Sequence, residues 1–368
     1  MHTNATRDAT HDVAQDRRGF VGKVAAGLTS GAAGLLGLGL PAPAPARTDS
    51  ADRGLAALGM ATTWINSPPL KPADLRGKVV LVQFWTYTCI NWMRSQPYVR
   101  AWSDHYKDDG LVVVGVHAPE YAFEKNLDNV RRAAMDLKVA LPIAVDNEHA
   151  IWRAFDNQYW PALYFIDAQG RIRHQQFGEG EYAKSEATLR RLLAEAGARA
   201  RPTAAVDPYA YELAADWPSL RSPENYLGAA RTQQFSSPGG VRDGRAGTYA
   251  VPTTLRLNDW ALAGDWTLSN EVASLDKPGG RIANRFHARD LHMVLGPAAP
   301  GTAVPFTVRI DGQPPGAAHG LDVDANGSGV VAQQRLHQLI RQQAPIRDRL
   351  FEIQFAAPGA QAFAFTFG

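Results

Sequence analysis

The sequence predicts an α/β domain followed by an all-β domain. Between about residues 60 and 200, apolar strand-like runs alternate with amphipathic helical stretches, which is typical of a mixed sheet with helices on both faces. Beyond residue 225, short runs of alternating apolar and polar residues are separated by glycine and proline turns. That second pattern predicts a β-sandwich or jelly roll at 226–368, after a proline-rich linker at 201–225.

The first 46 residues have the features of an export signal. The pair Arg17-Arg18 precedes an Ala/Gly/Leu-rich run at 24–40, and Ala44-Pro45-Ala46 offers the small residues that a signal peptidase reads. An uncleaved membrane anchor is the alternative, but the run is short and diluted by glycine, so no stable span is expected. We therefore expect twin-arginine export to the periplasm or another extracytoplasmic compartment, with 47–59 as a short linker.

The expected elements of the α/β domain, placed at 60–200, follow from the spacing of its apolar residues. The β-branched run at 78–85 suits a strand buried on both faces, and 91–108 has helical spacing with a bend at Pro97. Ser185 is expected to cap the last helix. The complete set is strands at 78–85, 111–116, 162–166 and 171–177, and helices at 91–108, 123–138, 147–155 and 185–197.

The β domain is read from its alternating strands. Three are clearest, at 306–310, 351–355 and 362–367. Turn signals at 238–240, 278–280 and 311–312 separate the runs. Each strand presents one apolar face, so the domain is expected to bury a core of its own.

Charge and cysteine content exclude several classes of function. The 38 basic and 36 acidic residues give a formal net charge of +2, without a basic cluster, so no nucleic-acid partner is expected. A single cysteine allows neither an intrachain disulfide nor a cysteine-rich zinc site. The run at 322–327 opens like a calcium loop, but Gln333 replaces the required glutamate. Neither a metal nor a cofactor is predicted.

The single cysteine, Cys89, follows a buried strand and opens a helix. Unpaired backbone N–H groups and the helix dipole at such a place favour a thiolate, which is a nucleophile. The alternative is a small buried apolar residue, since free cysteine is often buried. The position predicts a reactive thiol.

Several motifs together resemble the exported thioredoxin-like domain of the DipZ/TlpA group. They are Phe84-Trp85-Thr86-Tyr87-Thr88-Cys89-Ile90-Asn91-Trp92, then Pro97, Gly115-Val116-His117-Ala118-Pro119-Glu120 and Tyr159-Trp160-Pro161-Ala162. The resemblance covers 60–198, and the β domain resembles the module that follows it in DipZ-type proteins. It implies a thioredoxin fold, Cys89 as the attacking thiol, and Trp160-Pro161 as the cis-proline loop beside it. An extended substrate could pair with that loop.

Two positions depart from the family pattern. Trp92 stands where the second cysteine of Cys-x-x-Cys belongs, and Gln83 stands where a thioredoxin carries a buried carboxylate. Without a resolving thiol, dithiol turnover cannot occur within the chain. We therefore expect a monothiol route, in which Cys89 forms a mixed disulfide that an external thiol resolves.

A peroxiredoxin-like thiol peroxidase is one alternative. Thr86-x-x-Cys89 matches the peroxidatic motif, and Arg94 could supply the positive charge that orients a peroxide. An arginine on a helix is more often an ordinary exposed residue. Val82 replaces the proline of that motif. Under either chemistry Thr86, Thr88, Gln83 and Arg94 are the candidate supporting residues.

A redox-silent binding protein is the other alternative. It would hold a polypeptide or glycan in the groove beside Trp92 and Trp160-Pro161 together with the β domain, where Trp260 and Trp266 could stack on a sugar. Core or edge packing of these two rings is an equal alternative. His117 and Glu120 lie on a loop after a strand, where ordinary loop hydrogen bonding is the simpler expectation. The expected partner of the main hypothesis is an external thiol- or disulfide-bearing protein.

Overall fold

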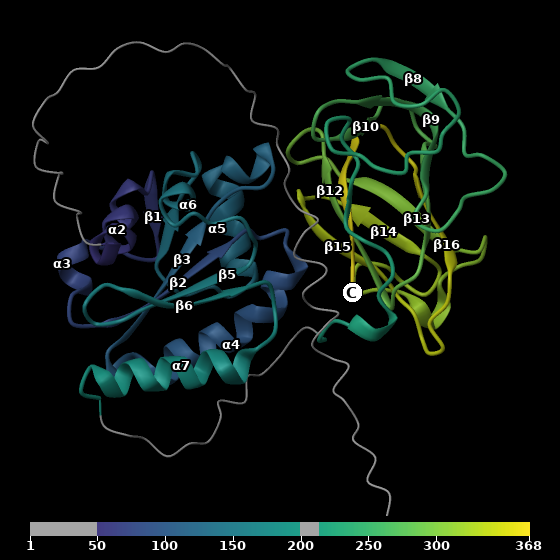
Figure 1. Ribbon diagram of the computed structural model, residues 1–368. Helices are drawn as coiled ribbons and strands as arrows, with labels where there is room; N and C mark the ends of the chain where they lie inside the picture. Colours follow the sequence, from purple (N-terminus) through teal and green to yellow (C-terminus); the bar gives the residue numbers. More distant parts are fainter. Residues whose placement is uncertain (1–49, 199–212) are drawn as a thin grey trace, which may run out of the picture. The chain divides into compact units, whose positions relative to one another are not determined.

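The structure is a computed structural model that describes residues 50–198 and 213–368 (Figure 1). The predicted export signal and its cleavage site lie outside the described residues, as do residues 201–212 of the predicted 201–225 linker. Within the two described ranges, no helix is both long and apolar enough to cross a membrane.

The first domain is built on a six-stranded mixed sheet with the order β1-β4-β3-β2-β5-β6. Strands β2, β3 and β4 pair in parallel, whereas β1, β5 and β6 pair antiparallel to their neighbours. All seven residues of β2 are buried, as expected for a central strand covered on both faces. The strands are β1 (Thr63–Ile65), β2 (Val79–Trp85), β3 (Leu111–His117), β4 (Ile143–Val145), β5 (Ala162–Ile166) and β6 (Ile172–Phe177).

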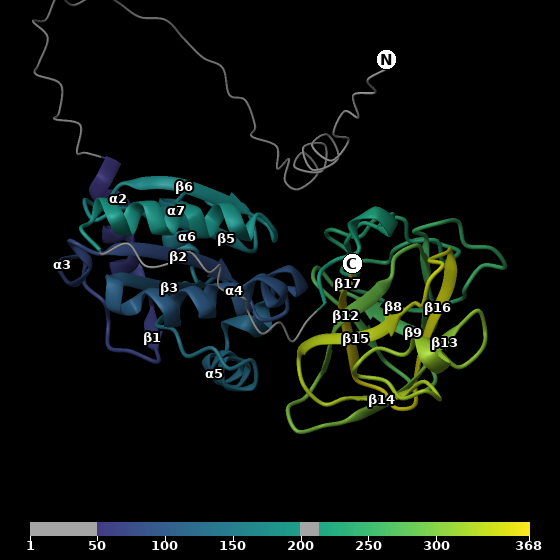
Figure 2. The same cartoon turned by 90° about the horizontal axis from the view of Figure 1, so that it is seen from below.

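Helices cover both faces of this sheet (Figures 1 and 2). Side chains of α4, α5 and α7 share one apolar core with β2, β3 and β5, and those of α2, α3 and α6 share another with the opposite face. The helices are α2 (Ser50–Ala57), α3 (Pro72–Leu75), α4 (Ile90–Tyr106), α5 (Leu127–Asp136), α6 (Ala150–Ala154) and α7 (Tyr182–Glu195). This arrangement confirms the predicted thioredoxin-like fold.

Two helix predictions need correction. The expected helix at 123–138 is divided into a 3₁₀ turn, η4 (Ala122–Lys125), and α5, because the Asn126 side chain accepts hydrogen bonds from Asp128 N and Asn129 N and starts a new helix. Ser185 does not cap the last helix. It is buried inside α7, which begins at Tyr182.

Both expected linkers carry structure at their ends. Leu55, Ala57 and Leu58, in the segment expected to be a linker at 47–59, are buried in the core of the first domain. At the other end, Leu220 belongs to the core of the β domain, and β7 (Asn225–Tyr226) pairs with its last strand. The domains therefore begin earlier in the chain than the composition changes suggest.

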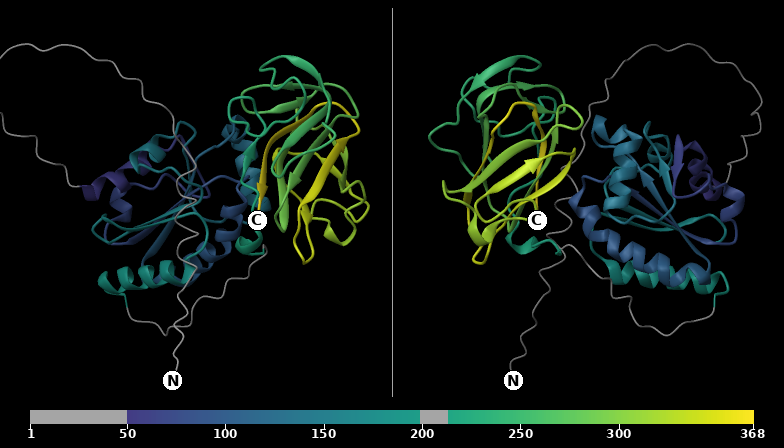
Figure 3. Two further views of the ribbon diagram at one scale, coloured as in Figure 1. Left: turned by 45° about the vertical axis from the view of Figure 1, so that its right-hand side comes forward. Right: turned by 180° about the vertical axis from the view of Figure 1, so that it is seen from behind.

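The β domain is a curled sheet of eleven strands whose pairings are antiparallel (Figure 3). In β13, buried and exposed residues alternate along the whole strand, as the sequence predicts. The strands after β7 are β8 (Ala246–Tyr249), β9 (Trp260–Leu268), β10 (Ala273–Leu275), β11 (Arg281–Phe286), β12 (Asp290–Pro297), β13 (Val304–Ile310), β14 (Ser328–Val331), β15 (Arg335–Arg341), β16 (Arg349–Phe355) and β17 (Ala360–Phe367).

The two tryptophans proposed as a sugar-stacking platform are core residues. Trp260 and Trp266 are both 0% exposed and belong to the apolar core of the β domain. Their indole N–H groups are also used internally, donating to Gln233 O and to Ala263 O. A buried ring cannot stack on a glycan, so the sugar-stacking interpretation is wrong and core packing is confirmed for both rings.

Candidate functional site

Cys89 lies at the N-terminus of α4, immediately after β2 and a short turn. It is the N-cap residue in an extended conformation, with Cys89 N donating to Thr86 O. The side chain is half-buried and carries the free thiol of the chain. The predicted position of the thiol, between a buried strand and a helix, is therefore present.

The loop at Trp160-Pro161 lies directly beside the thiol. Its peptide bond is cis, as the resemblance implied. The Cys89 Sγ lies 3.8 Å from the Trp160 carbonyl oxygen, to which the thiol donates. The Trp160 indole donates to Ala118 O at 3.0 Å, which ties this loop to the end of β3. The structure thus brings together two segments that are 71 residues apart in sequence.

Trp92 is part of the core, not of a groove. Its side chain is 1% exposed and stacks on Trp85, with ring centroids 4.4 Å apart. Gly115 on β3 makes room for this stack, because a Cβ there would lie 2.9 Å from Trp85 Nε1. The prediction that Trp92 lines a binding groove is therefore wrong. A buried aromatic side chain occupies the position of the second motif cysteine.

Gln83 occupies the interior below the motif. It is 2% exposed and donates from Nε2 to Ser95 Oγ at 3.3 Å, while Ser95 Oγ donates to Trp92 O at 2.8 Å. The buried position expected for a carboxylate thus holds a neutral amide that is hydrogen-bonded to helix α4. An amide cannot accept a proton as a base, so the site lacks that proton acceptor.

Arg94, on α4, is buried in the interior. The expectation that it is an ordinary exposed arginine on the helix surface is therefore wrong. Its side chain is 3% exposed, lies 3.4 Å from Glu179 and 3.8 Å from Asp290, and donates from Nε to Leu213 O. Because carboxylates engage this guanidinium in the interior, it has a structural role.

A residue that the sequence interpretation missed is Glu124 in η4. Its side chain is completely buried and accepts a hydrogen bond from the Thr88 hydroxyl at 2.7 Å. Thr86 and Thr88 are themselves buried, so neither is a surface hydroxyl that meets a substrate. The sequence signal for it is weak: Glu124 is an acidic residue directly after the apolar run at 121–123, and polar residues follow it.

His117 and Glu120 differ in their surroundings. His117 is fully buried beside Trp85 and Tyr87, and desolvation lowers its pKa to about 3, so it is neutral. Glu120 accepts a hydrogen bond from Tyr226 Oη and lies 3.6 Å from Arg231. Burial raises the pKa of Glu120, whereas these two partners oppose that change.

The electrostatics favour the protonated thiol. Burial raises the pKa of Cys89 above its ordinary value, and the nearby carboxylates of Glu224 and Glu120 act in the same direction. The backbone N–H groups of Trp92 and Asn91 oppose this effect, as expected at a helix N-terminus. The predicted depression of the thiol pKa is thus outweighed by desolvation.

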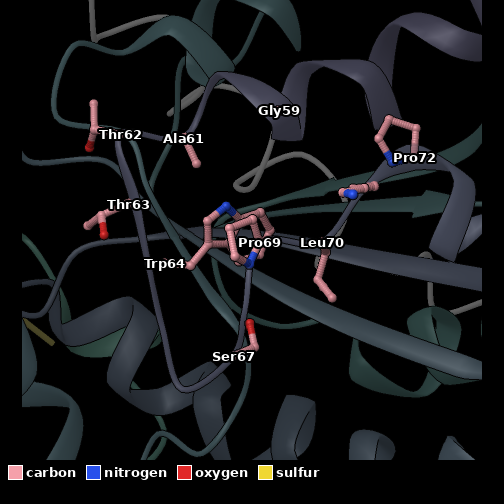
Figure 4. A pocket seen from close by; sticks show the side chains of 10 residues that line it. Gly59, Ala61, Thr62, Thr63, Trp64, Ser67, Pro69, Leu70 and Pro72 are labelled. Atoms are coloured by element: carbon pink, nitrogen blue, oxygen red, sulfur yellow. The ribbon is translucent and has the colours of Figure 1, made fainter.

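A surface opening of about 550 Å³ lies elsewhere in the first domain (Figure 4). Its lining comes from the segment between Gly59 and Pro72 and includes the side chains of Trp64 and Leu70. None of the predicted site residues contributes to it. Among the described residues, no group of three or more His, Cys, Asp or Glu could hold a metal ion.

Comparisons with known proteins agree with this fold. A family model described as redoxin matches residues 66–193, and one described as a thioredoxin-like C-terminal domain matches residues 222–368. Protein DipZ of Mycobacterium bovis and of Mycobacterium tuberculosis is 38% identical over 313 residues, which is 83% of this chain. The match spans 42% of the length of DipZ.

A shorter relative matches the first domain alone. Thiol-disulfide oxidoreductase YkuV of Bacillus subtilis is 33% identical over 132 residues. The match covers 36% of this chain and 88% of that protein.

Proposed function

Because the chain belongs to the redoxin family of thioredoxin-like, thiol-disulfide oxidoreductase-like proteins, we propose that it exchanges disulfides through Cys89 alone. The observation that carries this proposal is the place of the thiol, at the N-terminus of α4 and 3.8 Å from the carbonyl of the cis-proline loop. The buried Trp92 supports the single-cysteine form, since no second thiol is available in the chain.

In the proposed reaction, the Cys89 thiolate attacks one sulfur of a partner's disulfide. A Cys89–S–S–partner bond forms, the partner's S–S bond breaks, and the other sulfur leaves as a thiolate. An external thiolate then attacks the partner's sulfur in the mixed disulfide, and Cys89 leaves as a thiolate. A second external thiolate breaks the resulting external–partner disulfide, so that two external thiols are oxidised to one disulfide and the partner's disulfide is reduced to two thiols. Cys89 must lose its proton before it attacks. Because the pKa of this thiol is raised, deprotonation limits the rate of attack at neutral pH.

The test is to trap the first intermediate. The protein is mixed with a chromogenic aromatic disulfide, and the released thiolate and the protein mass are followed. One equivalent of thiolate and one adduct on Cys89 are expected, with release of the adduct only after an external thiol is added. Cys89→Ser is the control, and absence of an adduct on the wild-type protein in its native fold overturns the proposal.

A redox-silent binding protein is the second candidate, favoured by two observations on the thiol. The raised pKa of Cys89 and its hydrogen bond to Trp160 O describe a thiol that rests in its protonated form. Such a protein would bind its partner at the half-buried Trp160, because Trp92 is buried and cannot contact a partner. Alkylation of Cys89 across a pH series separates the two candidates: a thiol that stays inert up to high pH supports binding.

The peroxidase alternative loses the cation it requires, because Arg94 is enclosed by carboxylates. Hydrogen peroxide added to the reduced protein tests it directly. Rapid formation of sulfenic acid at Cys89 would restore this alternative.

Export is proposed from the sequence of residues 1–46 alone. Replacement of both Arg17 and Arg18 by lysine, followed by cell fractionation, tests it. Twin-arginine export predicts accumulation of the uncleaved protein inside the cell, and unchanged export of a form cleaved after Ala46 would overturn the proposal.

A further inference from the structure

The carboxylate of Glu124 joins two loops of the thiol site. One oxygen, Oε1, accepts from the Thr88 hydroxyl at 2.7 Å. The other, Oε2, accepts from the backbone N–H groups of Glu120 at 2.6 Å and Tyr121 at 3.1 Å. The carboxylate thus links the turn that ends at Cys89 to the loop that follows β3.

All three donors point at a group that is removed from solvent. Glu124 is 0% and Thr88 2% exposed, so water does not replace either partner if the contact is lost. A buried carboxylate is tolerated only when hydrogen bonds compensate for its lost hydration. Since Thr88 directly precedes Cys89, this compensation also fixes the residue next to the thiol.

The ionisation of Glu124 is sensitive to its surroundings. Burial raises its pKa to about 7, the charge of Glu120 acts in the same direction, and the hydroxyls of Thr86 and Thr88 oppose it. The other titratable groups that face it are the phenols of Tyr87 and Tyr121. Among the ion pairs of the described residues, none includes Glu124.

We propose that Glu124 is the positioning residue of the thiol site, whose ionised carboxylate holds Thr88 and thereby keeps Cys89 in the geometry for attack. An ionised carboxylate accepts charge-assisted hydrogen bonds at both oxygens, whereas a protonated one either reverses the bond to the Thr88 hydroxyl, which can also accept, or sets an O–H group against the backbone N–H groups. Protonation therefore loosens the Thr88 contact or the contacts to the loop after β3. The inference rests on the proposed thiol chemistry of Cys89, and it adds a second titrating group to that chemistry.

Two substitutions separate the contacts. Glu124→Gln keeps the shape but removes the charge. With the amide oxygen toward the two backbone N–H groups, the NH₂ group donates to the Thr88 hydroxyl, so that hydrogen bond is reversed and no longer charge-assisted; in the other orientation the NH₂ group faces the two N–H donors. Thr88→Val removes only the hydroxyl, and Thr88→Ser restores it as the matched control.

The assay is the rate of Cys89 alkylation by iodoacetamide between about pH 5 and pH 9.5, measured on the full chain. The wild-type profile should show an inflection near pH 7 in addition to the rise caused by the thiol. Glu124→Gln should lose this inflection, Thr88→Val should react on the order of five- to tenfold more slowly at pH 8, and Thr88→Ser should recover the wild-type rate.

The outcomes distinguish this inference from the proposed function. If Cys89 of the wild-type protein never reacts, the proposed function fails first. If it reacts, but Thr88→Val has the wild-type profile and circular dichroism shows native folding, Glu124 does not position the thiol and the inference is overturned. Should Glu124→Gln fail to fold, the two Thr88 variants alone decide the outcome.

Discussion

Replacing Trp92 with cysteine places a second thiol one helical turn after Cys89, at a separation that a disulfide can close. The same change removes a large side chain from the interior. Trp92 is 1% exposed and stacks on Trp85 at 4.4 Å, so its loss leaves a cavity under the motif. Truncations of buried aromatic residues cost about 3–5 kcal/mol, and we expect the reduced variant to lose that much free energy of unfolding.

Closing the new disulfide recovers only part of the lost free energy of unfolding. The chain-entropy relation gives about 2 kcal/mol for a loop of about four residues, because such a short loop restricts the unfolded chain little. The oxidised Trp92→Cys variant should therefore remain about 1–3 kcal/mol less stable than the wild-type protein. Trp92→Ser is the matched control, since it opens a similar cavity without adding a thiol.

Urea unfolding of reduced and oxidised samples measures these differences, and reduction of a model disulfide measures turnover. We expect Trp92→Cys to turn over slowly and Trp92→Ser to stop at the mixed disulfide. A loss below about 1 kcal/mol in both variants would refute the packing argument. A variant that forms the internal disulfide yet does not turn over would refute the view that only the resolving thiol is missing, and would favour the binding protein.

Three further predictions test the surroundings of the site. Adding Gln83→Asp to the Trp92→Cys variant should raise its turnover, because a buried carboxylate can accept the proton that an amide cannot; the readout is the same disulfide reduction assay. Gly115→Ala should lower the free energy of unfolding by about 1–3 kcal/mol, because its Cβ would lie 2.9 Å from Trp85 Nε1, whereas Gly59→Ala, with no heavy atom within 4 Å, should be nearly neutral in the same urea titration. Burial alone would raise the pKa of Asp167, but backbone and arginine donors hold this pKa below its ordinary value. The stabilisation by the Asp167 carboxylate is therefore present above the unfolded pKa of about 3.9 and is lost as pH falls through the folded pKa. The difference in free energy of unfolding between wild type and Asp167→Asn should be full at pH 7 and should shrink below about pH 4.

Local sequence patterns were sufficient to predict much of the fold. The apolar run of β2 and the alternation in β13 are properties of consecutive residues, and both strands are present. The helix that begins after Cys89 and the cis bond at Trp160-Pro161 are also confirmed, the latter from the family resemblance.

The features that the sequence did not reveal depend on distant partners. Arg94 reads as an exposed helical arginine until Glu179, 85 residues away, is found beside it. Likewise the role of Glu124 appears only when Thr88, 36 residues earlier, meets it. Composition also misplaced the start of the first domain, because Leu55 and Leu58 form only one i, i+3 apolar pair, which is too short to establish a helical period.

The buried Trp92 has a kinetic consequence for the proposed function. In a dithiol protein an internal thiol ends each covalent encounter, so the lifetime of the complex is a property of the protein. Here an aromatic ring occupies that position. On the proposed mechanism, the time for which a partner stays attached to Cys89 is set by the concentration and reactivity of thiols in the surroundings, and the complex persists longest where those thiols are scarce.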